Sequence, residues 1–221
     1  MTYLELINNV LKRLRERTVS TKDETTYSTL ISVLINDAKT EVENAWNWSA
    51  LRQTLTLSTS SGIFTYNLEG TGNNFSVMDV VNQNGDYFME YRTQHDFNQF
   101  YLNQTPTSGN PRYYNFNGVS SIAGGDTTDG DTKVDVYPKP DTIYTIFFNI
   151  IQRTGDLSAN TDKLICPSLP VLLLAYAKAV EERGEDGGVG SSSAYATATR
   201  VLNDAIAQDA QRHTEELEWV V

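Results

Sequence analysis

Apolar residues recur at helical spacing at both ends of this chain but not in its middle. In residues 4–14 and 27–46 they stand three and four positions apart, which places them on one face of a helix. The same spacing returns only after Cys166, in residues 169–180 and 195–206. An amphipathic helix must cover its apolar face, so helices from the two ends are expected to pack on one another. The four apolar stripes are Leu4, Ile7, Val10, Leu11 and Leu14; Tyr27, Leu30, Ile31, Leu34, Ile35, Ala38, Val42, Ala45 and Trp46; Leu169, Leu172, Leu173, Tyr176, Ala179 and Val180; and Tyr195, Ala198, Val201, Leu202, Ala205 and Ile206.

Local signals predict where these helices begin and end. Residues 21–24, Thr-Lys-Asp-Glu, have the form of a capping box at the start of the second helix. Pro167 and Pro170 suit the first turn of the third helix. Residues 184–190 are rich in glycine and break the pattern, and the serines at 191–193 are predicted to cap the last helix.

The middle of the chain has the alternating pattern of β-strands. Leu55 and Leu57 alternate with polar residues, and a turn at 60–62 leads into residues 63–68, which predicts a hairpin. A short helix is predicted at 93–102 and a long polar loop at 117–131, and loops of that length are usually functional or disordered. Further strands are predicted at 76–81, 87–91, 112–116, 133–137 and 143–152.

Together these patterns predict an α+β chain with a large inserted β part. We expect residues 1–52 and 163–221 to form one helical bundle and residues 53–162 to form an antiparallel β-rich domain. A length of 221 residues accommodates this arrangement of a core domain with an insertion.

The charge balance is acidic and uneven along the chain. There are 17 Lys+Arg against 28 Asp+Glu, a net charge of −11. Residues 1–52 carry 7 of each sign, residues 53–165 carry 6 basic and 12 acidic side chains, and residues 166–221 carry 4 and 9. No segment is basic enough to grip phosphates, which disfavours direct nucleic-acid binding. An acidic surface could nonetheless line a passage for DNA, because it would repel the phosphates.

The cysteine content of the chain excludes intramolecular disulfides and metal sites built from cysteine. Cys166 is the only cysteine, so an intramolecular disulfide and a thiolate metal cluster are both excluded. The N-terminal residues lack the continuous apolar run of a signal peptide, and the longest apolar stretch, 171–177, is too short to span a bilayer. We therefore expect a soluble protein of a reducing compartment, without contact with a membrane.

Three short segments suggest chemistry, and a structural explanation is preferred for each. Residues 126–131 resemble a calcium loop, but the acid spacing is wrong and no glutamate follows, which favours a solvated loop tip. His95 and Asp96 are adjacent on a predicted helix and so point in different directions. Residues 184–190 lack the Lys-Ser/Thr of a phosphate loop. We expect no catalytic residue, metal ion or cofactor, and hence no enzyme.

Aromatic residues are the remaining candidates for a binding surface. Trp46 belongs to a helix stripe and is assigned to the core, whereas Trp48 is left open between core and interface. Both could instead join Tyr113, Tyr114 and Phe116 in a platform that stacks on sugars or bases. At the C-terminus an acidic stem precedes an apolar tip, and large apolar residues there suit docking on a partner. The residues proposed for partner binding are Leu217, Trp219, Val220, Val221 and Trp48.

The N-terminal residues carry a family resemblance. Residues 2–16, Thr-Tyr-Leu-Glu-Leu-Ile-Asn-Asn-Val-Leu-Lys-Arg-Leu-Arg-Glu, are followed by Tyr27, Leu30-Ile31, residues 35–39 (Ile-Asn-Asp-Ala-Lys) and residues 43–48 (Glu-Asn-Ala-Trp-Asn-Trp). This pattern resembles the head-to-tail adaptor, or connector, proteins of tailed phages, of the tail-tubular-protein-A-like kind. The close match covers about the first fifty residues, and beyond them only the order of helices, strands and helices agrees.

The resemblance implies a structural virion protein located in the neck. It implies a homo-oligomeric ring, a dodecamer, that contacts the portal protein and the tail nozzle or tail tube and lets DNA pass without sequence-specific binding. Two alternative functions belong to other classes of protein. A β-rich carbohydrate- or receptor-binding tail module would use the tyrosine-rich strands but leaves the helices at both ends unexplained, and a hydrolase would need an acid–base pair that no spacing indicates.

Overall fold

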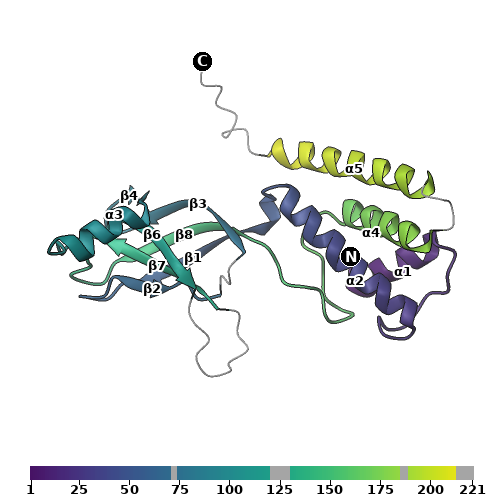
Figure 1. The fold of residues 1–221 in the computed structure, drawn as a ribbon, viewed down its shortest axis with the longest axis horizontal. Helices are drawn as coiled ribbons and strands as arrows, with labels where there is room; N and C mark the ends of the chain where they lie inside the picture. The colour runs from purple at the N-terminus through teal and green to yellow at the C-terminus, as the bar shows by residue number, and fades with distance from the viewer. Residues whose placement is uncertain (71–73, 120–129, 185–188, 213–221) are drawn as a thin grey trace, which may run out of the picture. The chain divides into compact units, whose positions relative to one another are not determined.

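The structure is a computed structural model that describes residues 1–70, 74–119, 130–184 and 189–212 (Figure 1). Two compact units make up the chain. The helical unit comprises Met1–Leu51 and Arg153–Val221, and the β unit comprises Arg52–Gln152. This confirms the predicted α+β class. Residues 153–162, which we assigned to the β domain, group with the helices. The domain boundaries stay a prediction.

The first helix, α1, spans Tyr3–Arg13 and begins with a capping box. Thr2 Oγ1 accepts a hydrogen bond from Glu5 N at 3.3 Å, and Thr2 N donates to Glu5 Oε2 at 2.8 Å. The hydrogen bond from the Thr2 backbone lowers the pKa of Glu5 below its usual value. The buried face matches the predicted stripe except at Leu4, which is only half-buried, while Tyr3 and Leu6 are buried.

The second helix, α2, spans Thr26–Ala45, and its cap differs from the predicted one. The capping box consists of Thr25 and Ser28, because Thr25 is the last extended residue before the helix. The predicted box at 21–24 lies in the preceding loop, where Glu24 Oε2 accepts a hydrogen bond from Ser20 N at 2.5 Å. The capping chemistry was recognised correctly but assigned one turn too early.

Helices α4, Ser168–Arg183, and α5, Val189–Ala210, complete the helical unit. Pro167 occupies the N-cap of α4 and Pro170 its first turn, as expected. Gly184 ends α4 with a φ of +63°, a left-handed value that glycine adopts without strain. Since α5 begins at Val189, the serines at 191–193 lie within its first turns and are not its cap, contrary to the prediction. In Figure 1, α5 runs alongside α4, and α4 in turn packs on α1 and α2.

The β unit consists of two four-stranded sheets. The first has the order β1 (Arg52–Ser58), β8 (Thr145–Gln152), β3 (Phe75–Asn82) and β4 (Tyr87–Phe88). The second has the order β2 (Thr65–Asn67), β7 (Thr132–Tyr137), β6 (Tyr113–Val119) and β5 (Glu90–Tyr91). A 3-10 turn, η1 (Ser49–Leu51), leads into β1, and the short helix α3 (Gln94–Asn98) continues into a π-helical turn, η2 (Gln99–Asn103).

The two sheets pack face to face around one apolar core. Leu57, Val80 and Phe148 contribute from the first sheet, and Val134 and Val136 from the second. Inward residues of both sheets form one cluster, so the β unit is a sandwich. One strand pair, β5 with β6, is parallel, so the sheets are not wholly antiparallel as we expected.

The predicted hairpin at 53–68 is wrong, although both of its strands exist. β1 pairs with β8 and β2 pairs with β7, so the two strands belong to different sheets. The predicted strand at 87–91 divides in the same way, because the chain passes from the first sheet to the second at Met89. β6 extends to Val119 and shortens the predicted loop at its start, while residues 120–129 lie outside the described ranges.

Candidate assembly surfaces

The segments that suggested chemistry have structural roles where the structure describes them. Asp96 belongs to the capping box of α3, since its Oδ2 accepts a hydrogen bond from Thr93 N at 3.3 Å. His95 is exposed to solvent. Burial raises the pKa of the Cys166 thiol to about 12. Within the described ranges, no group of three or more His, Cys, Asp or Glu side chains could hold a metal ion. Most of the acidic segment 126–131 lies outside those ranges.

None of the helices in the described part of the chain has the length and apolar character needed to cross a membrane.

Trp48 lies in the core and not at an interface. Its side chain is 1% exposed, and its Nε1 donates to the carbonyl of Val42 at 2.7 Å, near the C-terminal end of α2. A side chain buried within its own chain cannot present a surface to a partner, which resolves the open alternative in favour of the core. Trp48 is therefore corrected from a partner-binding residue to a core residue.

Two members of the aromatic platform that we considered, Trp48 and Tyr114, are buried within their own units and have no face free for stacking. Tyr114 is 8% exposed and contacts Phe148 edge-on with ring centroids 5.9 Å apart. Its ring is used in the sandwich core and offers no stacking face.

Asp209 fixes the end of α5 to the chain that follows α2. Its Oδ2 accepts hydrogen bonds from Trp46 Nε1 at 3.1 Å and Ser49 N at 3.0 Å, and its Oδ1 accepts one from Ser49 Oγ at 2.6 Å. Trp46 is half-buried by this contact and is not a full core residue as predicted. Asp209 is three residues before Arg212, the last described residue, so α5 is held to the helical unit close to the end of the described range.

A second polar group joins α2 to the segment that returns from the β unit. Ser32, Asn36, Lys39 and Glu43, spaced four, three and four residues apart, form what we name the polar stripe of α2. Lys39 and Glu43 are each 1% exposed, with Lys39 Nζ 3.2 Å from Glu43 Oε1.

The polar stripe holds the returning segment through its backbone. Lys39 Nζ donates to the Thr154 carbonyl at 2.8 Å, and Glu43 Oε2 accepts from Thr154 N at 3.1 Å. Asn36 accepts from Leu157 N at 3.0 Å and donates to Leu157 O at 3.1 Å, as a neighbouring strand would. Buried charges that are paired and hydrogen-bonded in this way favour one arrangement of the chain over others.

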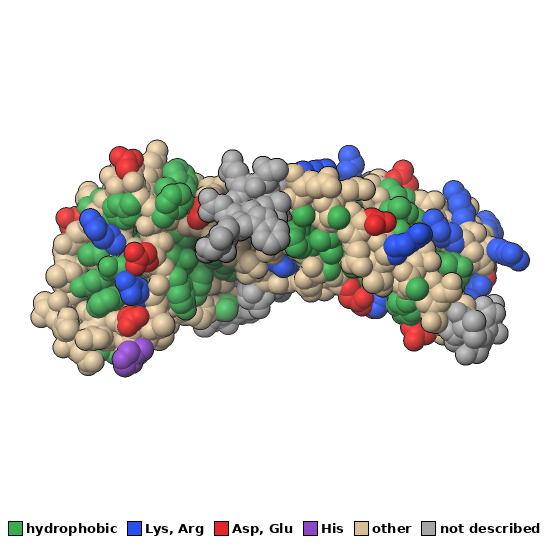
Figure 2. Space-filling model, turned by 90° about the horizontal axis from the view of Figure 1, so that it is seen from above, with side chains coloured by type: hydrophobic (Ala, Val, Ile, Leu, Met, Phe, Trp, Pro, Cys, Tyr) green, Lys and Arg blue, Asp and Glu red, His purple; other side chains and the backbone are tan. Residues whose placement is uncertain are grey.

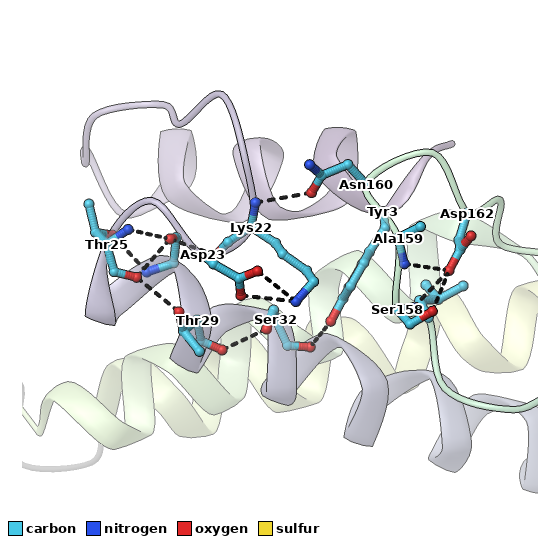
Figure 3. A network of polar contacts seen from close by, with 12 residues as sticks. Tyr3, Lys22, Asp23, Thr25, Thr29, Ser32, Ser158, Ala159, Asn160 and Asp162 are labelled. Atoms are coloured by element: carbon cyan, nitrogen blue, oxygen red, sulfur yellow. Dashed lines mark hydrogen bonds and ion pairs between the residues drawn. The ribbon is translucent and has the colours of Figure 1, made fainter.

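The N-terminus and the loop before α2 meet the same segment (Figure 3). Tyr3 Oη donates to Ser32 O at 2.7 Å, and Asn160 Oδ1 accepts from Lys22 N at 3.0 Å. Asp162 Oδ2 accepts from the backbone N–H groups of Ala159 and Ser158, each at 2.7 Å, and these bonds lower the pKa of Asp162. Residues 158–162 thus close one face of the helical unit.

A scan against protein families identifies what this scaffold is. The model described as SU10 adaptor protein matches residues 1–218, which includes both units. The chain belongs to the SU10 adaptor protein family. This is a family of phage head-to-tail adaptors, so the predicted resemblance is confirmed, and the protein has an adaptor's structural role. A search of curated proteins found no match.

Exposed basic side chains are concentrated near the end of α1 in the described part of the chain. Lys12, Arg13, Arg15 and Arg17, the cation cluster, are exposed at the end of α1. Among the described residues, no carboxylate forms an ion pair with any of them, whereas the nearby Glu16 pairs with Arg183. Figure 2 shows Lys and Arg side chains gathered over the helical unit.

The C-terminal candidates remain a prediction. Leu217, Trp219, Val220 and Val221 lie outside the described residues. What the structure adds is the position of Asp209, which sequence analysis missed. The sequence did indicate Asp209 in one way: it follows the predicted stripe residues Ala205 and Ile206 by four and three positions, which places an acidic residue on the inward face of the last helix.

Proposed function

We propose that this adaptor assembles as a twelve-membered ring in the virion neck, between the portal protein and the tail nozzle or tail tube, and that DNA passes through the ring. The observation that carries the proposal is the family match over residues 1–218, because it includes both the helical unit and the β unit. A ring of identical subunits needs a different surface on each side of the subunit. The cation cluster at one site of an otherwise acidic chain is consistent with such an asymmetry.

The charge of the chain supports the passage of DNA. A net charge of −11 per subunit is repeated around a ring, and like charges keep the phosphate backbone from adhering to the wall. A basic lining would instead bind DNA and slow its exit. We propose that acidic side chains line the passage and that the cation cluster faces protein.

The C-terminal residues are proposed to secure the subunit in the assembly. Leu217, Trp219, Val220 and Val221 follow an acidic stem, and Asp209 holds the helix from which this stem starts. A buried tryptophan is a frequent anchor of protein interfaces. The portal protein and the adjacent subunit are the two partners it could reach in a neck.

Co-assembly with the portal protein tests the proposed function. The purified adaptor and the purified portal are mixed, and the mass of the complex is measured by light scattering and its symmetry by electron microscopy. We expect a ring of twelve adaptors on the portal. A chain that stays monomeric beside the portal and instead binds a host-surface glycan would support the receptor-binding alternative.

A further inference from the structure

Among the described residues, no strand pairs with the outer edge of β1, which leaves a row of backbone groups there. β1 stands at the end of its sheet and pairs on one side, with β8. Thr59 N donates to Tyr144 O at 2.9 Å, and hydrogen-bonded positions recur at every second residue of an antiparallel pair. Leu57 and Leu55 therefore bond towards β8, and the residues between them point their N–H and C=O groups outward. The outward positions are Thr54, Thr56 and Ser58.

A groove of about 670 Å³ lies beside this edge and separates β1 from β2, the edge strand of the other sheet. Leu57 and Leu68 line it and also belong to the core between the sheets. Ile63 lines it as well and is 49% exposed, a large exposure for isoleucine. The groove thus lies between two strand edges that no other described strand covers, and apolar side chains line it. An open edge of this kind invites another strand.

The end of the chain has the composition of a strand that fits such a groove. Leu217, Trp219 and Val221 occupy every second position, so an extended backbone places all three on one face. Glu216 and Glu218 alternate with them. Tryptophan and valine favour strands. The nine residues after Arg212 span about 30 Å when extended, which is longer than the seven residues of β1.

We infer that the C-terminal strand of one adaptor copy pairs with the free edge of β1 in a second copy. Main-chain hydrogen bonds to the outward positions of β1 supply affinity, and alternate side chains supply specificity. Leu217 and Trp219 enter the groove beside Leu57 and Ile63. The inference rests on the proposed ring and names the contact that links its neighbours.

Strand exchange between copies covers two surfaces that would otherwise be exposed to water. The edge of β1 would otherwise remain a template for aggregation, and the apolar tip would otherwise remain in water. Since each subunit offers one strand and one groove, the exchange is head-to-tail, which is the type of contact that generates a ring where the rotation closes. If the C-terminal strand bound the portal instead, the groove beside β1 would remain empty.

Peptide binding tests the acceptor. A labelled peptide of residues 213–221 is titrated with a chain that ends at Arg212, and its fluorescence anisotropy is measured. We expect saturable binding, and roughly thirtyfold weaker binding for the Trp219→Ala peptide, the change expected for loss of an interface anchor. Thr56→Pro in the acceptor should weaken binding as well, because it removes an outward N–H and leaves the bonds to β8 in place.

A matched pair of variants distinguishes a specific loss of binding from misfolding of the acceptor. Ile63→Asp places a charge in the groove, and Ile143→Asp places the same charge at an isoleucine that is 68% exposed and outside the groove. We expect the first variant to lose the peptide and the second to retain it. Equal binding by both variants, or no binding by the unmodified acceptor, would overturn the inference. A ring formed by the chain ending at Arg212 without peptide binding would leave the proposed function standing.

Exchange between copies has its own test. Tagged full-length Ile63→Asp chains can donate a strand but not accept one, and untagged chains ending at Arg212 can accept but not donate. The tagged chains should retain the untagged ones on affinity resin, whereas a tagged chain ending at Arg212 should not. Peptide binding without this retention would show that the strand is not donated to a second copy, and would refute exchange.

Discussion

At the scale of single residues, the most consequential finding is that Lys39 and Glu43 are buried as a pair. Their spacing of four residues is typical of a solvent-exposed helix pair, and neither residue belongs to the apolar stripe predicted for residues 27–46. They are covered because residues 153–162 return along α2, and Thr154 bonds to both side chains. That partner is 111 residues away from Glu43, so local spacing could not reveal the burial.

Removing one charge of this pair should destabilise the helical unit strongly. Lys39→Met leaves the Glu43 carboxylate buried without its ion-pair partner, which typically costs about 3–5 kcal/mol. The double variant Lys39→Met, Glu43→Leu removes both charges and should recover much of that loss. Urea unfolding followed by circular dichroism measures both. Equal stability of the single variant and the parent would show that the pair does not hold the returning segment.

The Cys166 thiol should be unreactive in the folded adaptor. Burial raises its pKa to about 12, so at about pH 8 the native thiol is neutral, and the thiolate is the reactive form. An unfolded cysteine has a pKa of about 8.5 and would react readily. Alkylation by iodoacetamide, followed by mass spectrometry with and without denaturant, distinguishes the two states. Rapid labelling of the native chain would mean that this part of the helical unit opens.

At the scale of elements, periodicity predicted the helices and strands well but not their partners. The stripes at 4–14 and 27–46 correspond to α1 and α2 because a buried helix face has a period that local sequence records. The hairpin at 53–68 failed because alternation shows only that a strand has two faces. Leu57 and Leu68 both point into the sandwich core, which satisfies alternation equally well from two different sheets.

The candidate assembly surfaces were predictable only in part, because they too depend on contacts between distant segments. An apolar tip at the chain end can be recognised in the sequence, whereas the groove beside β1 exists only because β1 and β2 end up at the edges of separate sheets. Asp209 likewise acquires its role from Ser49, which lies 160 residues earlier. Contacts between distant segments depend on topology, and neither spacing nor composition encodes them directly.

The apolar face of α2 should tolerate no charge, while its outer face should. Ile35 is fully buried and Val33, two residues earlier, is 52% exposed. Ile35→Asp buries an unpaired carboxylate and should cost about 3 kcal/mol or more, enough to unfold the helical unit or lower its melting temperature by several degrees. Val33→Asp is the matched control and should melt like the parent. Circular dichroism on heating compares the two, and equal melting would show that this stripe does not face the core.

At the scale of the whole molecule, the C-terminal segment should matter for assembly and not for folding. Removal of residues 217–221 leaves α5 and the contacts of Asp209 intact, so the melting temperature should hardly change. An interface anchor is worth about 2 kcal/mol or more, roughly a thirtyfold change in affinity, and a ring repeats the loss at every subunit. We expect heads purified from the mutant phage to lack the adaptor and the tail. Normal incorporation would assign the contacts to other surfaces.

Cryo-electron microscopy of the neck in intact virions tests the central claim most directly. The account predicts a closed ring of twelve subunits between portal and tail, each subunit fitting the helical unit and the β sandwich, with acidic side chains towards the DNA. In the same map, a strand from one subunit should lie against β1 of its neighbour. A neck without this protein, or its presence only at the distal tail, would contradict the account.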